Sequence, residues 1–237
     1  MRSLFIVSLP RSLSSLVYQV ARRSLGVDDL AWTSDGELLN PDRHASYGRA
    51  EGRALKYTRR WAPERRFERM HAYLDELVRP EGRVYKDVVQ PFVLASWLKD
   101  RKLAILYIRR PLADVVFAMQ AQGWSYPARA VAPPDRGEDQ HDQSEAAVVA
   151  GLLAARRALE QLPAERVDYD ELISDEAALP AALNRLYPHR NLAPVDYLDE
   201  FFAERRAATL ARRSSPSYRA LEGRIAQLIS GWEHSID

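Results

Sequence analysis

The sequence predicts an α/β protein whose parallel sheet is covered by helices on both faces, and two observations favour this class. Short apolar runs of strand length alternate along the chain with segments of helical periodicity. The run LAILYI at 103–108 is apolar throughout, as expected of a central strand that is buried on both faces. Alternating strands and helices form a parallel sheet because each helix returns the chain to the same edge.

The elements follow this alternation from the first residues onward. A strand at the N-terminus leads through a turn into a helix, and two later strands each precede a helix that begins at a proline, the residue that favours helix starts. The charged, aromatic stretch 33–69 is expected outside the sheet. The expected strands span 3–9, 83–89, 103–108 and 166–172, and the expected helices span 14–25, 91–99, a segment from Pro111, 145–162, and about 175–187, 196–211 and 217–230.

Length and composition exclude several classes of protein. The 237 residues suffice for one core, and without internal repeats we expect a single domain over residues 1–237. With 34 basic and 33 acidic residues, the net charge of +1 gives no support to a nucleic-acid partner. The absence of cysteine excludes disulfides, zinc-thiolate sites and a cysteine nucleophile. No apolar run reaches the roughly 18 residues that span a bilayer, so we expect a soluble, cytoplasmic protein without a membrane partner.

The turn after the first strand carries the chemistry. In the stretch FIVSLPRSLSSLVYQ at 5–19, an apolar strand passes into a helix through Arg11, Ser12, Ser14 and Ser15. Ligands bind beyond the carboxyl ends of parallel strands, where the next helix presents free N–H groups and a positive dipole. An anion is therefore the expected ligand, although a capping serine and a solvated arginine would explain the same residues.

This turn differs from the phosphate loop of nucleotide triphosphatases, which requires glycines and a Gly-Lys-Ser/Thr element. It resembles instead the 5′-phosphosulfate loop, P-[KR]-[ST]-G-[ST]-[ST], of the sulfotransferases that use 3′-phosphoadenosine 5′-phosphosulfate (PAPS). PRSLSS at 10–15 aligns with that motif, and Leu13 stands where the family has glycine. A positive φ at this position would strain a leucine. The resemblance implies a P-loop-like sulfotransferase fold and an anion site for the sulfate end of PAPS.

Further segments resemble the same family in the same order. ILYIRRPLADVVFAM at 105–119 is similar to its second signature, a strand followed by R-[ND]-P, which implies that Arg109 binds the 3′-phosphate; the family's nearby serine is replaced by Phe117. RVDYDELI at 166–173 resembles a structural strand end. VYKDV at 84–88 resembles the strand that carries a lysine near the sulfonate in bacterial members, which implies that role for Lys86. An ordinary solvated lysine is the alternative.

The resemblance also implies a general base. Family members use a histidine after the second strand or a glutamate beyond the loop; VVQPFVLASWL has no histidine, and Glu37 lies at the expected distance, with Asp35 and His44 as reserves. The same SDGE stretch could be an exposed turn. The polar segment 123–144 could be an acceptor lid or a disordered loop. The implied PAPS-binding residues are Arg11, Ser12, Leu13, Ser14, Ser15, Arg109, Arg212 and Arg213, and the implied catalytic residues are Glu37, Lys86 and Arg11, without a metal.

The resulting hypothesis is a PAPS-dependent sulfotransferase that acts on a hydroxyl group of a small molecule. In-line sulfonate transfer requires cationic and N–H groups aimed at the transferring and leaving oxygens, and a base for the acceptor's proton. Two alternatives remain open: a nucleotide-dependent kinase-like phosphotransferase on the same fold, and a non-catalytic anion-binding scaffold. The acceptor and the oligomeric state are not predicted.

Overall fold

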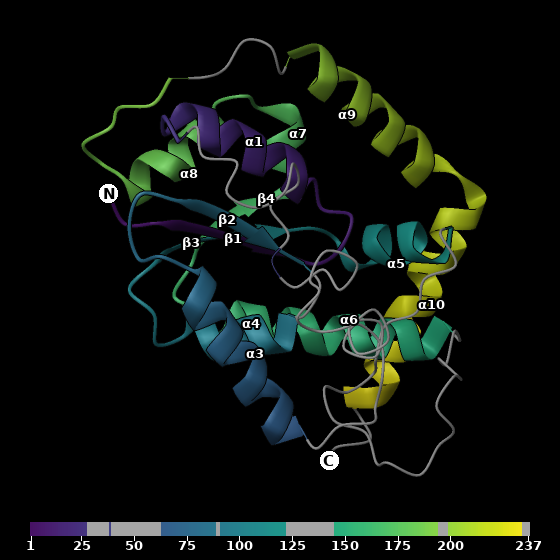
Figure 1. Ribbon diagram of the computed structural model, residues 1–237. Coiled ribbons are helices and arrows are strands. Elements are labelled where there is room, and N and C mark those ends of the chain that lie inside the picture. The colour runs from purple at the N-terminus through teal and green to yellow at the C-terminus, as the bar shows by residue number, and fades with distance from the viewer. Residues whose placement is uncertain (28–37, 39–62, 89–90, 122–144, 194–198, 234–237) are drawn as a thin grey trace.

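The computed structural model describes residues 1–27, 38, 63–88, 91–121, 145–193 and 199–233, and it contains a four-stranded parallel sheet (Figure 1). The order of the strands is β2-β1-β3-β4, and each neighbouring pair is parallel, so β1 lies inside the sheet. This confirms the predicted α/β class. The strands are β1 (Leu4–Ser8), β2 (Val84–Asp87), β3 (Ala104–Arg109) and β4 (Glu165–Asp168).

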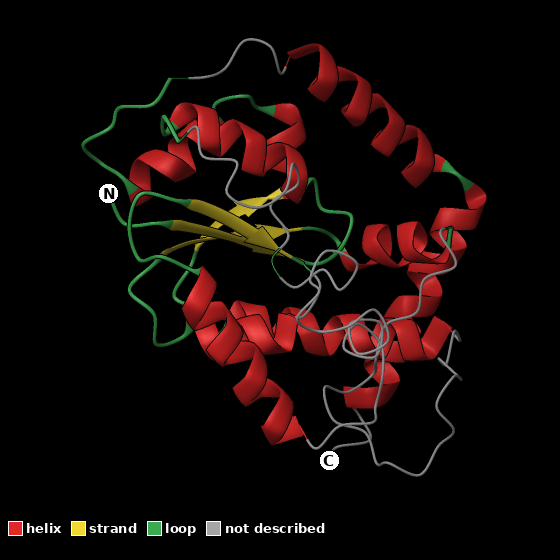
Figure 2. Ribbon diagram, in the orientation of Figure 1, coloured by secondary structure: helices red, strands yellow, loops and turns green. Residues whose placement is uncertain are grey.

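Helices cover both faces of the sheet, as Figure 2 shows. Successive side chains of a strand point to opposite faces, so Leu4 and Ile6 of β1 pack into one apolar cluster while Phe5 and Val7 pack into the other. None of the described helices is long and apolar enough to cross a membrane. The cluster that holds Leu4 and Ile6 includes residues of α1 (Ser14–Ser24), α7 (Tyr169–Ser174), α8 (Ala178–Leu186) and α9 (Asp199–Ser214). The cluster that holds Phe5 and Val7 includes residues of α3 (Pro63–Leu77), α4 (Pro91–Leu98), α5 (Leu112–Gln120), α6 (Glu145–Glu160) and α10 (Pro216–Glu233).

The topology places a switch point between β1 and β3, where successive helices change to the other face of the sheet. Strands β1 and β3 are neighbours, but α1, which follows β1, packs on one face, and α5, which follows β3, packs on the other. In open parallel sheets the crevice between two such strands, at their carboxyl ends, is where ligands bind. The β1–α1 turn lies at that edge.

Three elements differ from the sequence-based expectation. The last strand ends at Asp168, and the chain continues as α7, because acidic residues at 170 and 171 favour the start of a helix. Helix α9 runs to Ser214, so Arg212 and Arg213 lie in its last turn rather than after it. Helix α3 was not predicted; its residues Met70 and Leu74, four apart, are buried against the core.

Candidate anion site at the carboxyl edge of the sheet

The β1–α1 turn has an unusual backbone. Arg11 and Leu13 both have positive φ values, 65° and 63°, and Ser12 stands between them. Leu13 is the residue that precedes α1, and its conformation is left-handed. Backbone N–H groups in turns of this kind converge into a concavity that binds anions. Because a left-handed conformation costs a non-glycine residue about 1–2 kcal/mol, the turn keeps this shape at the expense of stability.

The hydroxyl and basic groups of the turn differ in burial. Ser12 is fully buried, and its Oγ has no hydrogen-bond partner among the described residues. Ser14 is also buried, while Arg11 and Ser15 are exposed. The first turn of α1 contains no acidic residue. The helix N-terminus therefore presents a positive potential that no neighbouring carboxylate on α1 cancels.

Lys86 reaches the turn from the neighbouring strand. It pairs in register with Ile6, so both side chains point to the face that α1 covers. The side chain is 1% exposed, and Nζ donates a hydrogen bond of 2.9 Å to Ser15 Oγ. Sequence analysis expected Lys86 near the turn, and the structure brings the two together. A buried ammonium group requires hydrogen-bond partners, and Ser15 is one of them.

Arg109 faces the other side of the sheet. It follows Tyr107, which belongs to the cluster opposite α1, and it pairs in register with Asp168 on β4. Its Nε and Nη2 donate to the two carboxylate oxygens at 2.5 and 2.6 Å, and this pairing lowers the pKa of Asp168 and raises the pKa of Arg109. Arg109 is thus held by a cross-strand partner and is not gathered with Arg11 and Lys86.

The next residue, Arg110, is the one that contacts the turn, and sequence analysis did not single it out. Its Nη1 donates to the backbone carbonyl of Arg11, and its guanidinium lies 4.3 Å from the centre of the Tyr169 ring. Only 5% of the residue is exposed. Alternation along the strand places Arg110 on the α1 side when Arg109 points away from it. Applied to the Arg109–Arg110 pair, this alternation could have indicated from the sequence that only one of the two arginines faces the turn.

A second group that was not predicted is Asp114, in the first turn of α5. It is fully buried and accepts from Arg213 Nη2 at 2.6 Å, while Arg212 and Arg110 lie 3.3 and 3.6 Å away. Burial alone would raise the pKa of Asp114, but the hydrogen bond from Arg213 and the nearby charge of Arg110 overcome it and hold that pKa below its ordinary value. A carboxylate in the otherwise apolar helix LADVVFAMQ was the clue in the sequence.

The arginine pair at the end of α9 is therefore drawn toward the sheet. Arg213 binds Asp114 and also Asp170 of α7, with its Nη2 at 2.8 Å from Asp170. The Nε and Nη2 atoms of Arg212 are buried and make no hydrogen bond among the described residues, although Nη2 lies 3.3 Å from Asp114 as an ion pair. Phe117, which occupies the position of the family's serine, packs against Tyr218 at a ring distance of 5.8 Å.

The remaining sequence-based candidates lie outside the described residues. They are the expected base Glu37, its reserves Asp35 and His44, and the whole segment 123–144. Their roles stay predictions. Within the described ranges, no group of three or more histidine and acidic side chains is arranged to hold a metal ion.

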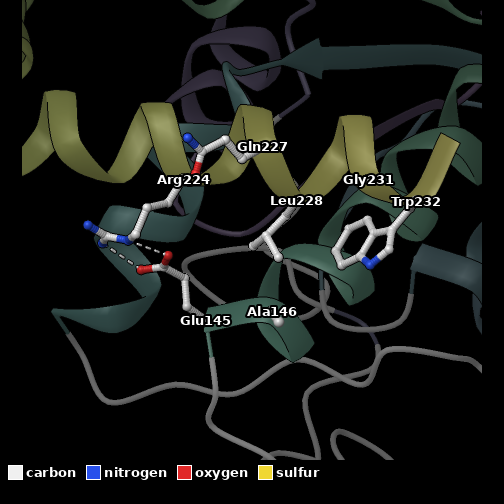
Figure 3. Close-up of a pocket in the computed structure, with 7 residues that line it drawn as sticks. All are labelled: Glu145, Ala146, Arg224, Gln227, Leu228, Gly231 and Trp232. Carbon is white, nitrogen blue, oxygen red and sulfur yellow. Dashed lines mark hydrogen bonds and ion pairs between the residues drawn. The ribbon is translucent and has the colours of Figure 1, made fainter. Parts of the chain in front are cut away.

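A cavity of about 460 Å³ lies elsewhere, between the first turn of α6 and the end of α10 (Figure 3). Arg224 closes one side of it by donating from Nε and Nη2 to the Glu145 carboxylate, both at 2.7 Å. Gln120, at the end of α5, also donates to Glu145. The cavity is thus at the far end of α5 from Asp114. Its lining contains none of the candidate residues: Glu145, Ala146, Arg224, Gln227, Leu228, Gly231 and Trp232.

Comparison with known proteins gives little to add to this geometry. No protein-family model matches the chain, and no curated protein matches it. Among solved structures, a sulfotransferase domain from the curacin biosynthetic pathway is similar, at 16% identity and a TM-score of 0.41; the match covers 78% of this chain and 73% of that one. A likeness at this level supports no conclusion about function, so function has to be argued from the chain's own residues.

Proposed function

We propose that the protein is a sulfotransferase that moves the sulfonate group of PAPS to a hydroxyl group of a small molecule. The observation that carries the proposal is the contact between buried Lys86 and Ser15, at the mouth of the β1–α1 turn. It adds a cation to a loop that already offers converging N–H groups and serine hydroxyls. The motif resemblance of residues 10–15 and the position of Lys86 are independent of each other and support the same ligand.

The residues of the turn fit the sulfate end of PAPS better than they fit a nucleoside triphosphate. The turn has no Gly-Lys-Ser/Thr element, which holds the terminal phosphates and magnesium in the triphosphatases. The unpartnered Oγ of buried Ser12 is a donor that a sulfate or phosphate oxygen would satisfy. Arg11 and Lys86 would balance the charge of the ligand.

PAPS carries a second anionic group, the 3′-phosphate. The motif resemblance assigns it to Arg109, with Arg212 and Arg213 nearby. The geometry favours Arg110 over Arg109, because Arg110 shares the face of the β1–α1 turn while Arg109 is bound to Asp168. The buried Nε of Arg212, which makes no hydrogen bond among the described residues, supports a phosphate between α5 and the end of α9.

When bound, PAPS supplies the sulfonate group and leaves as adenosine 3′,5′-bisphosphate, while the acceptor oxygen forms the new S–O bond. Glu37 is the proposed base that takes the acceptor's proton. Lys86, Arg11 and the N-terminus of α1 are proposed to stabilise the negative charge on the transferring and leaving oxygens. No metal ion is needed in this scheme, because the protein's own cations take that role.

The test is calorimetric titration with adenosine 3′,5′-bisphosphate, beside ATP with magnesium. We expect the bisphosphate to bind and ATP to bind weakly or not at all. Binding of ATP alone would overturn the proposal in favour of a kinase-like reaction. Binding of the bisphosphate without sulfonate transfer from PAPS to any of a panel of phenols and alcohols would instead indicate a scaffold. Where transfer is observed, Glu37→Gln is the catalytic control and should lose it.

The same titration identifies which arginine binds the 3′-phosphate. We expect Arg110→Ala to weaken bisphosphate binding by about tenfold or more, the loss of a charge-assisted hydrogen bond. Arg109→Ala is expected to weaken it less. If Arg109→Ala abolishes binding and Arg110→Ala does not, the motif-based assignment is right and the geometric one is wrong.

A further inference from the structure

Asp114 sits in surroundings that normally exclude a charged carboxylate. It is fully buried, and its neighbours on α5, Val115 and Val116, belong to the apolar core. A buried carboxylate without partners would be neutral or strongly destabilising. Here one partner is local, Arg110, four residues before Asp114, and two come from the distant end of α9, Arg212 and Arg213. The hydroxyl of Tyr218 on α10 also donates to it.

The cluster contains more cations than its carboxylates neutralise. Three guanidinium groups surround Asp114, and the one further carboxylate described beside them, Asp170, binds Arg213. Among the described residues, the buried Nε of Arg110 and the buried Nε and Nη2 of Arg212 make no hydrogen bond. Arg110 Nε and Arg212 Nη2 lie 3.6 and 3.3 Å from the Asp114 carboxylate as ion pairs, so the Nε of Arg212 is the donor left without either kind of contact there. The unsatisfied donors belong to the two arginines that Asp114 does not hold by a short hydrogen bond.

We propose that Asp114 is a positioning residue, which fixes Arg110, Arg212 and Arg213 beside the β1–α1 turn as a receptor for a phosphate-type or sulfate-type anion. The inference rests on the proposed function. Asp114 holds Arg213 through Nη2 and Nε, and so fixes the end of α9 against α5. Arg110 links the cluster to the turn through the carbonyl of Arg11. Asp114 itself does not touch the anion.

The opposite role, a carboxylate that competes with the ligand, makes a different prediction. If Asp114 only cancelled positive charge, then Asp114→Asn would raise the affinity for anions. If it positions the arginines, the variant loses affinity although its site is more positive. The sign of the change in affinity therefore distinguishes the two roles.

The experiment measures dissociation constants of two probes, adenosine 3′,5′-bisphosphate and inorganic pyrophosphate, for the wild type and Asp114→Asn at fixed ionic strength. We expect Asp114→Asn to weaken whichever probe binds by about tenfold. Equal or tighter binding by the folded variant overturns the inference. If the wild type binds pyrophosphate and not the bisphosphate, the PAPS proposal fails while Asp114 is still tested; if it binds neither, the inference fails as well.

Two further variants separate positioning from folding. Asp114→Glu keeps the buried charge and displaces the carboxylate by one methylene, so it addresses the case in which Asp114→Asn does not fold; weaker binding supports positioning, and unchanged binding contradicts it. Glu145→Gln breaks a different ion pair, the one that Arg224 of α10 makes with Glu145 of α6, far from the turn. We expect it to change stability and not anion affinity. A parallel loss of affinity in Glu145→Gln would mean that Asp114 acts through stability alone.

Discussion

At the scale of single residues, the question for Lys86 is whether it stabilises the fold or binds a ligand. Its ammonium group is buried at the end of a strand and donates a hydrogen bond to Ser15. Removing one partner of a buried charged contact usually destabilises a protein, because the remaining groups lose their partner. Stability and binding therefore have to be measured together to distinguish a structural role of Lys86 from a ligand-binding role.

We expect Lys86→Met to lower the free energy of unfolding by about 1–3 kcal/mol, because the polar partners of the buried ammonium group lose a hydrogen bond. The same change should weaken binding of adenosine 3′,5′-bisphosphate by about tenfold, because a charge-assisted contact is lost. Chemical denaturation and calorimetry measure the two quantities. Lys99→Met, at an exposed lysine after α4, is the matched control and should change neither. Severe destabilisation with unchanged affinity would make Lys86 a structural residue.

The sequence could predict some of these residues and not others. Lys86 and the serines of the turn follow from strand ends that meet at one edge of a parallel sheet. Arg110 and Asp114 do not follow from a motif, because their importance depends on where the end of α9, a hundred residues later, packs. Arg109 shows the converse: its motif position says nothing of Asp168, a partner that only the β3–β4 register brings opposite it.

At the scale of elements, the strands and most helices could be predicted, because apolar runs and prolines mark them locally. The predicted strand 3–9 is observed as β1 over Leu4–Ser8, and the predicted helix 14–25 as α1 over Ser14–Ser24. The strand expected at 166–172 was half wrong, since its second half, YDEL, is the start of helix α7. Both forms bury Leu172 and Ile173, so the apolar pattern could not decide between them.

The β1–α1 turn makes a prediction at this scale. Leu13 is left-handed, and it packs partly against the apolar cluster of α1. Leu13→Gly removes the strain but also the packing and adds chain entropy, so we expect a change in stability of less than about 1 kcal/mol. Leu13→Val should destabilise by about 1–2 kcal/mol, because a β-branched residue tolerates positive φ poorly. Denaturant titration of both variants measures this; a Leu13→Val protein as stable as wild type would contradict the left-handed geometry.

At the scale of the whole molecule, carboxylates tie distant elements together. Asp168 binds Arg109 across β3 and β4, Glu145 binds Arg224 between α6 and α10, and Asp114 joins α5 to α9. Hydrogen bonds from Arg109 and Arg224 lower the pKa values of Asp168 and Glu145, and the arginines around Asp114 lower its pKa despite burial. All three shifts have the same direction.

This direction fixes how stability depends on pH. A carboxyl group whose pKa is lower in the folded chain stabilises the fold above its unfolded pKa, about 3.9 for Asp and 4.3 for Glu. That contribution is lost as the pH falls through the folded pKa. We expect the free energy of unfolding to be nearly constant from about pH 7 to 5 with respect to these groups and to fall steadily below about pH 4.5.

The variant Asp168→Asn tests the contribution of one carboxylate to this loss of stability at acidic pH. Asp168 and Arg109 are 36% and 43% exposed, so water screens the pair, and the variant should lose no more than about 1 kcal/mol at neutral pH. Its stability should then fall less steeply on acidification, because one of the carboxylates that must be protonated is gone. Urea denaturation at a series of pH values from neutral to acidic measures both slopes. An acid slope in Asp168→Asn as steep as that of the wild type would mean that the Arg109 pair does not form in solution, and Arg109 would then be available to an anionic ligand.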